Sequence, residues 1–158
     1  VAFPRGLTGG SGRAPKPENR FNFSFSGVKT ALLYHVGEQT FADAELANVA
    51  ASFQEAIVEV LVSKTVDACR HADARTLVLC GGVACNGRLR EALGAAVEGL
   101  PVRVCIPPPK FCADNGAMTA GLGWHVWRAN GSSDGLDVRI DARFRPEQEN
   151  MRVPFGVQ

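Results

Sequence analysis

The sequence has almost no excess of charge of either sign. Among its 158 residues, 17 are lysine or arginine and 16 are aspartate or glutamate, a formal net charge of +1. A chain that binds a polyanion over much of its surface is usually strongly basic, so nucleic-acid binding here would need a local basic patch. The 46% hydrophobic and 21% charged residues are typical of a globular protein, and the length allows one compact domain with a sizeable core.

Paired cysteine motifs are also absent. The cysteines are odd in number, form no CxxC pair and have mostly apolar neighbours; they are Cys69, Cys80, Cys85, Cys105 and Cys112. This pattern favours reduced thiols in a cytoplasmic protein over a disulfide framework.

Targeting segments are missing from the sequence as well. No apolar run approaches the length of a membrane span and no signal peptide opens the chain, so no membrane partner is expected. The opening Val1-Ala2-Phe3-Pro4 lacks an initiator Met and reads like the middle of a protein. We therefore expect the chain to be a fragment.

The N-terminal segment, residues 1–20, is expected to be a flexible basic loop or an inter-lobe segment. It is rich in Gly, Pro and Ser, has no hydrophobic period, and contains four cations, which are Arg5, Arg13, Lys16 and Arg20. These cations could contact RNA phosphates, although a solvated basic loop is the commoner case.

Strands and helices alternate through the rest of the chain. Alternating or continuous apolar runs predict strands at 21–25, 76–80 and 102–106 and an edge strand at 136–144. Helical periodicity predicts helices at 28–36, 43–71 (capped by Asp43), 86–97 and 114–128. This order predicts an α/β lobe over 21–130 with a partly parallel sheet flanked by helices, followed by an edge strand and loose tail at 131–158.

The strongest local motif lies at residues 77–86, where an apolar strand ends in Gly81-Gly82 and a helix starts after Asn86. Glycines here permit positive φ and let a ligand approach the backbone. The helix N-terminus favours a nucleotide or phosphate, and Asn86 could bind a ribose or an acyl-phosphate group. The alternative is a tight strand–helix turn in which Asn86 only caps the helix.

A second motif places Asp114 where a loop meets a helix. A carboxylate there is either an N-cap or a hard oxygen ligand for a metal. One Asp cannot form a metal site, and the three histidines, His35, His71 and His125, show no ligand spacing with it. Any further metal ligands must come from outside this chain.

A third motif, residues 23–30, brings together Ser24, Ser26 and Lys29 between aromatic residues. These side chains could line a polar site with Lys29 facing a phosphate, although a lysine in such a place is more often a surface residue. The glycine spacing is not that of a P-loop.

Four segments in order, 23–30, 51–54, 81–86 and 112–118, resemble the tRNA N6-adenosine threonylcarbamoyltransferase family, once called O-sialoglycoprotein endopeptidases. The resemblance covers residues 21–124 and places the chain in the C-terminal half of that family. Cys85 replaces a residue that is normally Ala or similarly small, and Val28 stands where a larger aliphatic is common.

The resemblance implies the second lobe of an actin-like, Hsp70-like and sugar-kinase-like (ASKHA) fold. It implies transfer of threonylcarbamoyl from threonylcarbamoyl-AMP to N6 of adenosine 37 in tRNAs that read ANN codons. By the same resemblance Asn86 binds the adenylate, Gly81 and Gly82 form the nucleotide floor, and Ser24, Ser26 and Lys29 lie in a family motif without an assigned role.

The resemblance also implies a cofactor and partners. Asp114 matches a ligand of one divalent metal, iron or zinc, whose two His ligands are expected from the missing N-terminal half. Partners would be tRNA, an inactive paralogue and an ATPase of the bacterial complex. With one metal ligand of three, the chain by itself is expected to be inactive.

Two alternatives remain open at this point. One is another ASKHA enzyme, a small-molecule kinase or a carbamoyltransferase, which should not combine the segments at 23–27 and 112–115. The other is a non-catalytic interaction module similar to the family's inactive paralogues, which generally lack the metal aspartate. Asp114 therefore argues against the second alternative.

Overall fold

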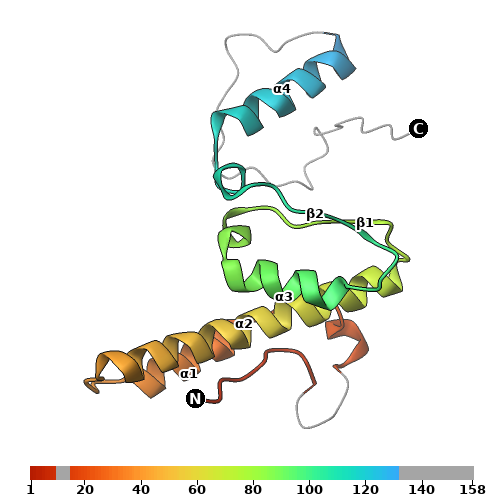
Figure 1. Cartoon of the computed structure of the whole chain (residues 1–158). Coiled ribbons are helices and arrows are strands. Elements are labelled where there is room, and N and C mark those ends of the chain that lie inside the picture. Colours follow the sequence, from red (N-terminus) through yellow and green to blue (C-terminus); the bar gives the residue numbers. More distant parts are fainter. Residues whose placement is uncertain (10–14, 132–158) are drawn as a thin grey trace. The chain divides into compact units, whose positions relative to one another are not determined.

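The computed structural model describes residues 1–9 and 15–131. The chain divides into two units, residues 1–113 and 114–158, and each is described by itself. The first unit contains, in chain order, η1 (Pro17–Asn19), α1 (Ser26–Val36), α2 (Asp43–His71), β1 (Thr76–Val78), η2 (Gly82–Cys85), α3 (Gly87–Val97), β2 (Arg103–Cys105) and η3 (Pro109–Phe111). The described part of the second unit contains α4 (Gly116–Asn130) (Figure 1).

The 29-residue helix α2 organises the first unit, because its two halves contribute to two separate apolar clusters. Near its N-terminal half, Val49 and Ala56 pack with Val28 of α1 and with Phe3, which is only 4% exposed. Near its C-terminal half, Val66 packs with Leu93 and Val97 of α3 and with apolar residues of the sheet; in Figure 1 α3 lies along α2.

The sheet of the described residues is a parallel pair in which Thr76, Leu77 and Val78 of β1 face Arg103, Val104 and Cys105 of β2. Helix α3 is the crossover between the two strands, as parallel pairing requires. The predicted α/β class and the parallel pairing are confirmed. Both strands are shorter than expected, and the predicted edge strand at 136–144 lies outside the described residues.

The prediction of a strand at 21–25 is wrong. This segment has no regular structure, and Ser26 and Gly27 form the first turn of α1 instead of ending a strand. Phe23 and Phe25 stack with ring centroids 6.2 Å apart, and Phe25 packs against the first apolar cluster. The alternating aromatics therefore anchor a loop.

The caps of two helices also differ from the prediction. Helix α2 begins at Asp43, and its cap is made by Glu45, whose Oε2 accepts from the Ala42 amide at 3.0 Å. Helix α4 begins at Gly116, and Asn115 caps it by accepting from the Met118 amide at 2.9 Å. Asp114 is therefore not the cap of α4.

Two of the four cations in the predicted basic loop are paired with α2. Arg5 donates to Glu59 at 2.7 Å, and Arg20 makes a two-point contact with Asp67 at 2.7 and 2.8 Å. The buried ammonium of Lys64 donates to the Asn19 and Arg20 carbonyls at 2.8 and 2.9 Å. The described parts of this segment are thus tied to the helix, and Arg13 lies outside them.

Helix α2 is long and apolar enough to cross a membrane when judged on length and composition alone, contrary to the expectation that no run approaches that length. Core helices meet the same criteria, and α2 contributes side chains to both apolar clusters.

Candidate functional site

The turn after β1 has the backbone that its glycines permit. Gly81 has φ of +88°, a conformation in which a side chain would be strained, and its carbonyl accepts from the Ala84 amide at 2.9 Å to start η2. A Cβ added at Gly82 would meet nothing within 4 Å. Gly81 therefore shapes the turn, and the backbone at both Gly81 and Gly82 borders open space that a ligand could occupy.

Asn86 uses both ends of its side chain in the fold. Its Oδ1 caps α3 by accepting from the Leu89 amide at 2.9 Å, and its Nδ2 donates to Oε1 of Gln54 on α2 at 2.8 Å. A carboxamide offers two acceptor sites and two donor hydrogens, so one of each remains for another partner. The capping interpretation is confirmed, and it leaves room for ligand binding by the same side chain.

An ion pair next to Asn86 joins the start of α3 to α2. Arg88 donates from Nε and Nη2 to the two carboxylate oxygens of Glu55 at 2.8 and 2.7 Å. These hydrogen bonds hold the pKa of Glu55 below its ordinary value. The side chains are 39% and 34% exposed, so solvent weakens the pair, which nevertheless joins the first turn of α3 to α2 at two points.

Arg90 connects the loops that follow the two strands. Its guanidinium donates to the Ala84 carbonyl after β1 and to the Pro107 carbonyl after β2, the latter at 2.8 Å, and lies 3.2 Å from Cys112 Sγ. The Cys85 thiol reaches the Pro109 carbonyl at 3.5 Å. In parallel α/β sheets, ligands bind beyond the carboxyl ends of the strands, which is where these loops lie.

The motif at 23–30 forms a small polar group on its own. Ser24 Oγ and Ser26 Oγ are 3.2 Å apart, and Lys29 is exposed on α1. A Cβ at Gly6 would lie 2.0 Å from the Ser24 carbonyl oxygen, so the N-terminal segment packs closely against this loop. Within the described part of residues 1–113, no hydrogen bond or ion pair joins these side chains to Gly81, Gly82 or Asn86.

Asp114 is exposed and stands two residues before α4 in the second unit, so its position relative to Asn86 is not defined. Residues 1–9 and 15–131 contain no group of three or more His, Cys, Asp or Glu side chains that could hold a metal. The histidines pack against aromatic rings: His35 near Phe3 and Phe41, His71 near Phe21, and His125 near Trp124.

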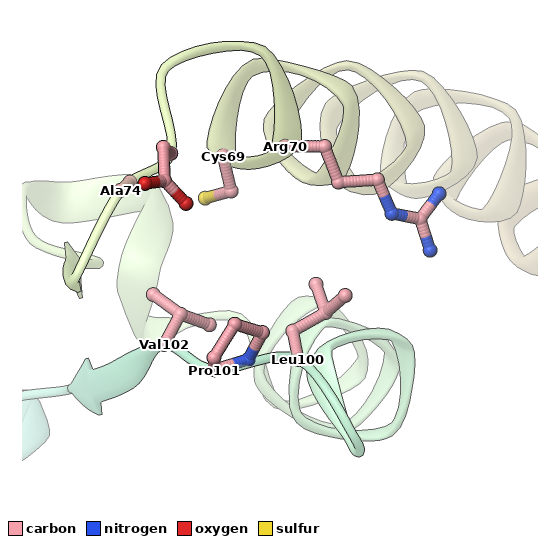
Figure 2. Close-up of a pocket in the computed structure, with 7 residues that line it drawn as sticks. Cys69, Arg70, Ala74, Leu100, Pro101 and Val102 are labelled. Carbon is pink, nitrogen blue, oxygen red and sulfur yellow. The ribbon is translucent and has the colours of Figure 1, made fainter.

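A cavity of about 200 Å³ opens at the other end of α3, away from its capped N-terminus (Figure 2). Cys69, Arg70, Asp73 and Ala74 line it from the end of α2 and the turn that follows, and Leu100, Pro101 and Val102 line it from the segment after α3. None of the predicted site residues lies there.

Sequence reasoning missed two residues of the candidate site. Helical periodicity alone places Gln54, Glu55 and Glu59 on the polar face of the long helix. All three instead contact residues far away in sequence: Asn86, Arg88 and Arg5 respectively. The signal that could have found Gln54 is its place in the second of the four family-like segments, residues 51–54.

The first unit is therefore an α/β unit in which a glycine turn follows the carboxyl end of a parallel strand and leads to a capped helix. The family model for tRNA N6-adenosine threonylcarbamoyltransferase matches residues 2–121, and the chain belongs to this family.

Three relatives of that printed name illustrate the match. The protein of Symbiobacterium thermophilum is 46% identical over 122 residues, covering 77% of this chain and 36% of the relative. The protein of Corynebacterium diphtheriae is 39% identical, covering 93% of this chain and 42% of the relative. The protein of Persephonella marina is 37% identical, covering 94% of this chain and 41% of the relative. The chain thus spans about two-fifths of the length of these relatives.

Proposed function

We propose that the chain is the C-terminal lobe of an enzyme that transfers threonylcarbamoyl from threonylcarbamoyl-AMP to N6 of adenosine 37 in tRNAs that read ANN codons. The observation that carries the proposal is the family match over residues 2–121, which contains all four segments identified in the sequence. The lobe would belong to an ASKHA fold, with which the α/β unit and its parallel strand pair are compatible.

In this proposal the turn after β1 holds the adenylate. The backbone of Gly81 and Gly82 forms the floor, where the open space at Gly82 lets the ligand approach. The first turn of α3 has no acidic residue to offset its positive end, which therefore favours a phosphate. Asn86 contacts the adenylate with the donor and the acceptor that capping and Gln54 leave over.

The transfer forms a bond between N6 of the adenosine and the carbonyl carbon of the threonylcarbamoyl group. The bond from that carbon to the phosphate oxygen breaks, AMP leaves, and N6 loses a proton. Groups that hold the AMP moiety in place raise the rate by orienting the carbonyl toward the amine. Gly81, Gly82 and Asn86 have this orienting role in the proposal, and we assign no catalytic residue to this chain.

The residues present are compatible with one part of a metal site. Asp114 is exposed and is not used as the cap of α4, so its carboxylate is available as a hard oxygen ligand. The described residues provide no cluster of ligands, so two His ligands would come from the N-terminal portion of the enzyme. Iron or zinc bound there would supply a Lewis acid that binds the donor and polarises its carbonyl.

The proposed partners are tRNA and, in a bacterial complex, an inactive paralogue and an ATPase, all in the cytoplasm. The near-balanced charge of the chain requires a local basic surface for any contact with tRNA. Arg5 and Arg20 are paired with carboxylates of α2, so among the described cations of residues 1–30 the exposed Lys16 and Lys29 are the better candidates.

The test is threonylcarbamoyl transfer to unmodified tRNA, measured for residues 1–158 alone and joined to the N-terminal portion of the Symbiobacterium relative. We expect transfer only by the joined protein, and strongly slowed transfer in Asp114→Ala with an unchanged circular dichroism spectrum. Transfer by the chain alone would refute the account of missing metal ligands. Inactivity of a folded, metal-loaded joined protein would favour the non-catalytic interaction module, and phosphorylation of a small molecule would favour another ASKHA enzyme.

A further inference from the structure

Gln54 is the one member of segment 51–54 whose side chain contacts the candidate site among the described residues. Phe53 packs against the first apolar cluster, and Ser52 Oγ donates to the Asn48 carbonyl at 2.7 Å within α2. Gln54 is exposed, but its Oε1 accepts from Nδ2 of Asn86 at 2.8 Å, across 32 positions of the sequence. The side chain of an exposed glutamine can hydrogen-bond to water instead, so stability alone does not explain this contact with a distant residue.

The contact completes the fixing of the Asn86 carboxamide. The Leu89 amide requires an oxygen at the capping position, and Gln54 provides an acceptor for the nitrogen on the other side. A rotation of the carboxamide by 180° would lose the bond from the Leu89 amide, and it would also lose the bond to Gln54 unless the Gln54 carboxamide rotated with it. The remaining donor and acceptor of Asn86 are therefore held in one orientation.

The contact is not required to hold the two helices together. The two-point ion pair of Arg88 with Glu55 joins α3 to α2 at the next residue of α2, and the cluster of Val66, Leu93 and Val97 packs the helices further along. An exposed neutral hydrogen bond adds little to this packing. The main consequence of the Gln54 contact is thus local, at the amide of Asn86.

We propose that Gln54 is a positioning residue that fixes the side-chain amide of Asn86 for the adenylate. The proposal rests on the proposed function, because it assigns Gln54 a role through the nucleotide contact of Asn86. Gln54 does not touch the ligand itself in this account. Its effect on binding therefore requires Asn86 to be present.

The first arm of the test observes the contact without any ligand. NMR records the pair of signals from the two side-chain amide protons of Asn86 in the full chain. This pair is identified because it disappears in Asn86→Ser. Gln54→Met keeps the length but removes the acceptor, so the pair should shift toward solvent-exposed values and exchange faster. Gln54→Glu keeps an acceptor and should preserve the pair, and Asn48→Met, which removes an exposed amide from the same helix, should leave it unchanged. An unchanged pair in Gln54→Met would overturn the proposal.

The second arm measures AMP binding by titration calorimetry on the chain joined to the N-terminal portion of the Symbiobacterium relative. Gln54→Met should raise the Kd for AMP about two- to threefold, the size expected for one exposed neutral hydrogen bond. The same change in an Asn86→Ala background should have no further effect, and Gln54→Glu at 0.5 M NaCl, where added charge is screened, should restore binding.

The outcomes separate this proposal from the proposed function. If the unsubstituted protein binds AMP but Gln54→Met leaves the Kd unchanged, or changes it equally without Asn86, the positioning role is wrong while the function stands. If the unsubstituted protein does not bind AMP, the proposed nucleotide site is wrong and the positioning role with it, although the NMR arm still decides whether the two amides are in contact.

Discussion

Asn86 combines a structural and a proposed binding role, and substitutions can separate the two. Asn86→Ala removes the cap of α3 and the bond to Gln54. Loss of an N-cap costs about 1 kcal/mol, and an exposed neutral hydrogen bond adds about 0.5 kcal/mol. Asn86→Ala should therefore lower the free energy of unfolding by about 1.5 kcal/mol, roughly a tenfold change in the unfolding constant.

Asn86→Ser should behave differently, because serine caps helices nearly as well as asparagine. Its hydroxyl can still accept from the Leu89 amide, but it is too short to bridge to Gln54. We expect Asn86→Ser to recover about 1 kcal/mol of the stability lost in Asn86→Ala. It should nevertheless leave the Kd for AMP in the joined protein as high as in Asn86→Ala, since the carboxamide is absent.

Urea unfolding followed by far-ultraviolet circular dichroism measures the stability of each variant. Tryptophan fluorescence is unsuitable, because both tryptophans, Trp124 and Trp127, lie on α4 in the other unit. Hydrogen exchange of the Leu89 amide reports the cap directly. Equal stability of the Ala and Ser variants would refute the capping contribution, and an unchanged Kd for AMP in Asn86→Ser would exclude the carboxamide as the binding group.

Three further predictions concern packing, pH and metal. Leu93 of α3 is 2% exposed and packs with residues of α2 and the sheet, so Leu93→Ala should lower the free energy of unfolding in urea by about 3 kcal/mol. Leu46→Ala, at a 51% exposed position of α2, should lower it by less than about 0.5 kcal/mol. Equal losses would contradict the packing of α3. Hydrogen bonds from Arg88 depress the pKa of Glu55, so the stabilisation is complete above its ordinary pKa of 4.5 and is lost as the pH falls through the lower folded pKa. The stability gap to Glu55→Gln should accordingly be constant above that range and shrink below it, and a gap that grew on acidification would exclude the ion pair as its cause. Asp114→Ala in the joined protein should lower the iron or zinc content measured by mass spectrometry, and unchanged content would remove Asp114 from the metal site.

The elements that carry a repeated signal are those that the sequence predicts best. The long helix at Asp43–His71 agrees with its predicted bounds, because its apolar face repeats over many turns. The alternation at 21–25 is short, and it is the same whether the aromatics face a sheet or anchor a loop. Only the tertiary packing of Phe25 against the first apolar cluster decides between them.

The candidate site could be predicted in part. Gly81 and the cap at Asn86 follow from local backbone requirements, which the sequence contains. Asp114 and Asn115 are neighbours, and both side chains can cap a helix. Which of them caps α4 depends on a shift of one residue in where the helix begins. The contact of Gln54 with Asn86 depends on how α3 packs on α2, and no periodicity in either helix contains that information.

The arrangement around α3 indicates which step this lobe would influence. Gln54 contacts Asn86, Arg88 joins α3 to α2, and Arg90 connects the loops that follow the two strands. The contacts described for these three side chains are all with other groups of the protein. Substitutions at these residues should weaken the binding of the adenylate and thus raise KM, provided the fold persists. Asp114 differs, because in the proposal it acts on the reacting carbonyl through the metal, so its loss should lower kcat. The two kinds of effect arise in separate units of the chain, and a kinetic comparison of Gln54→Met with Asp114→Ala would distinguish them.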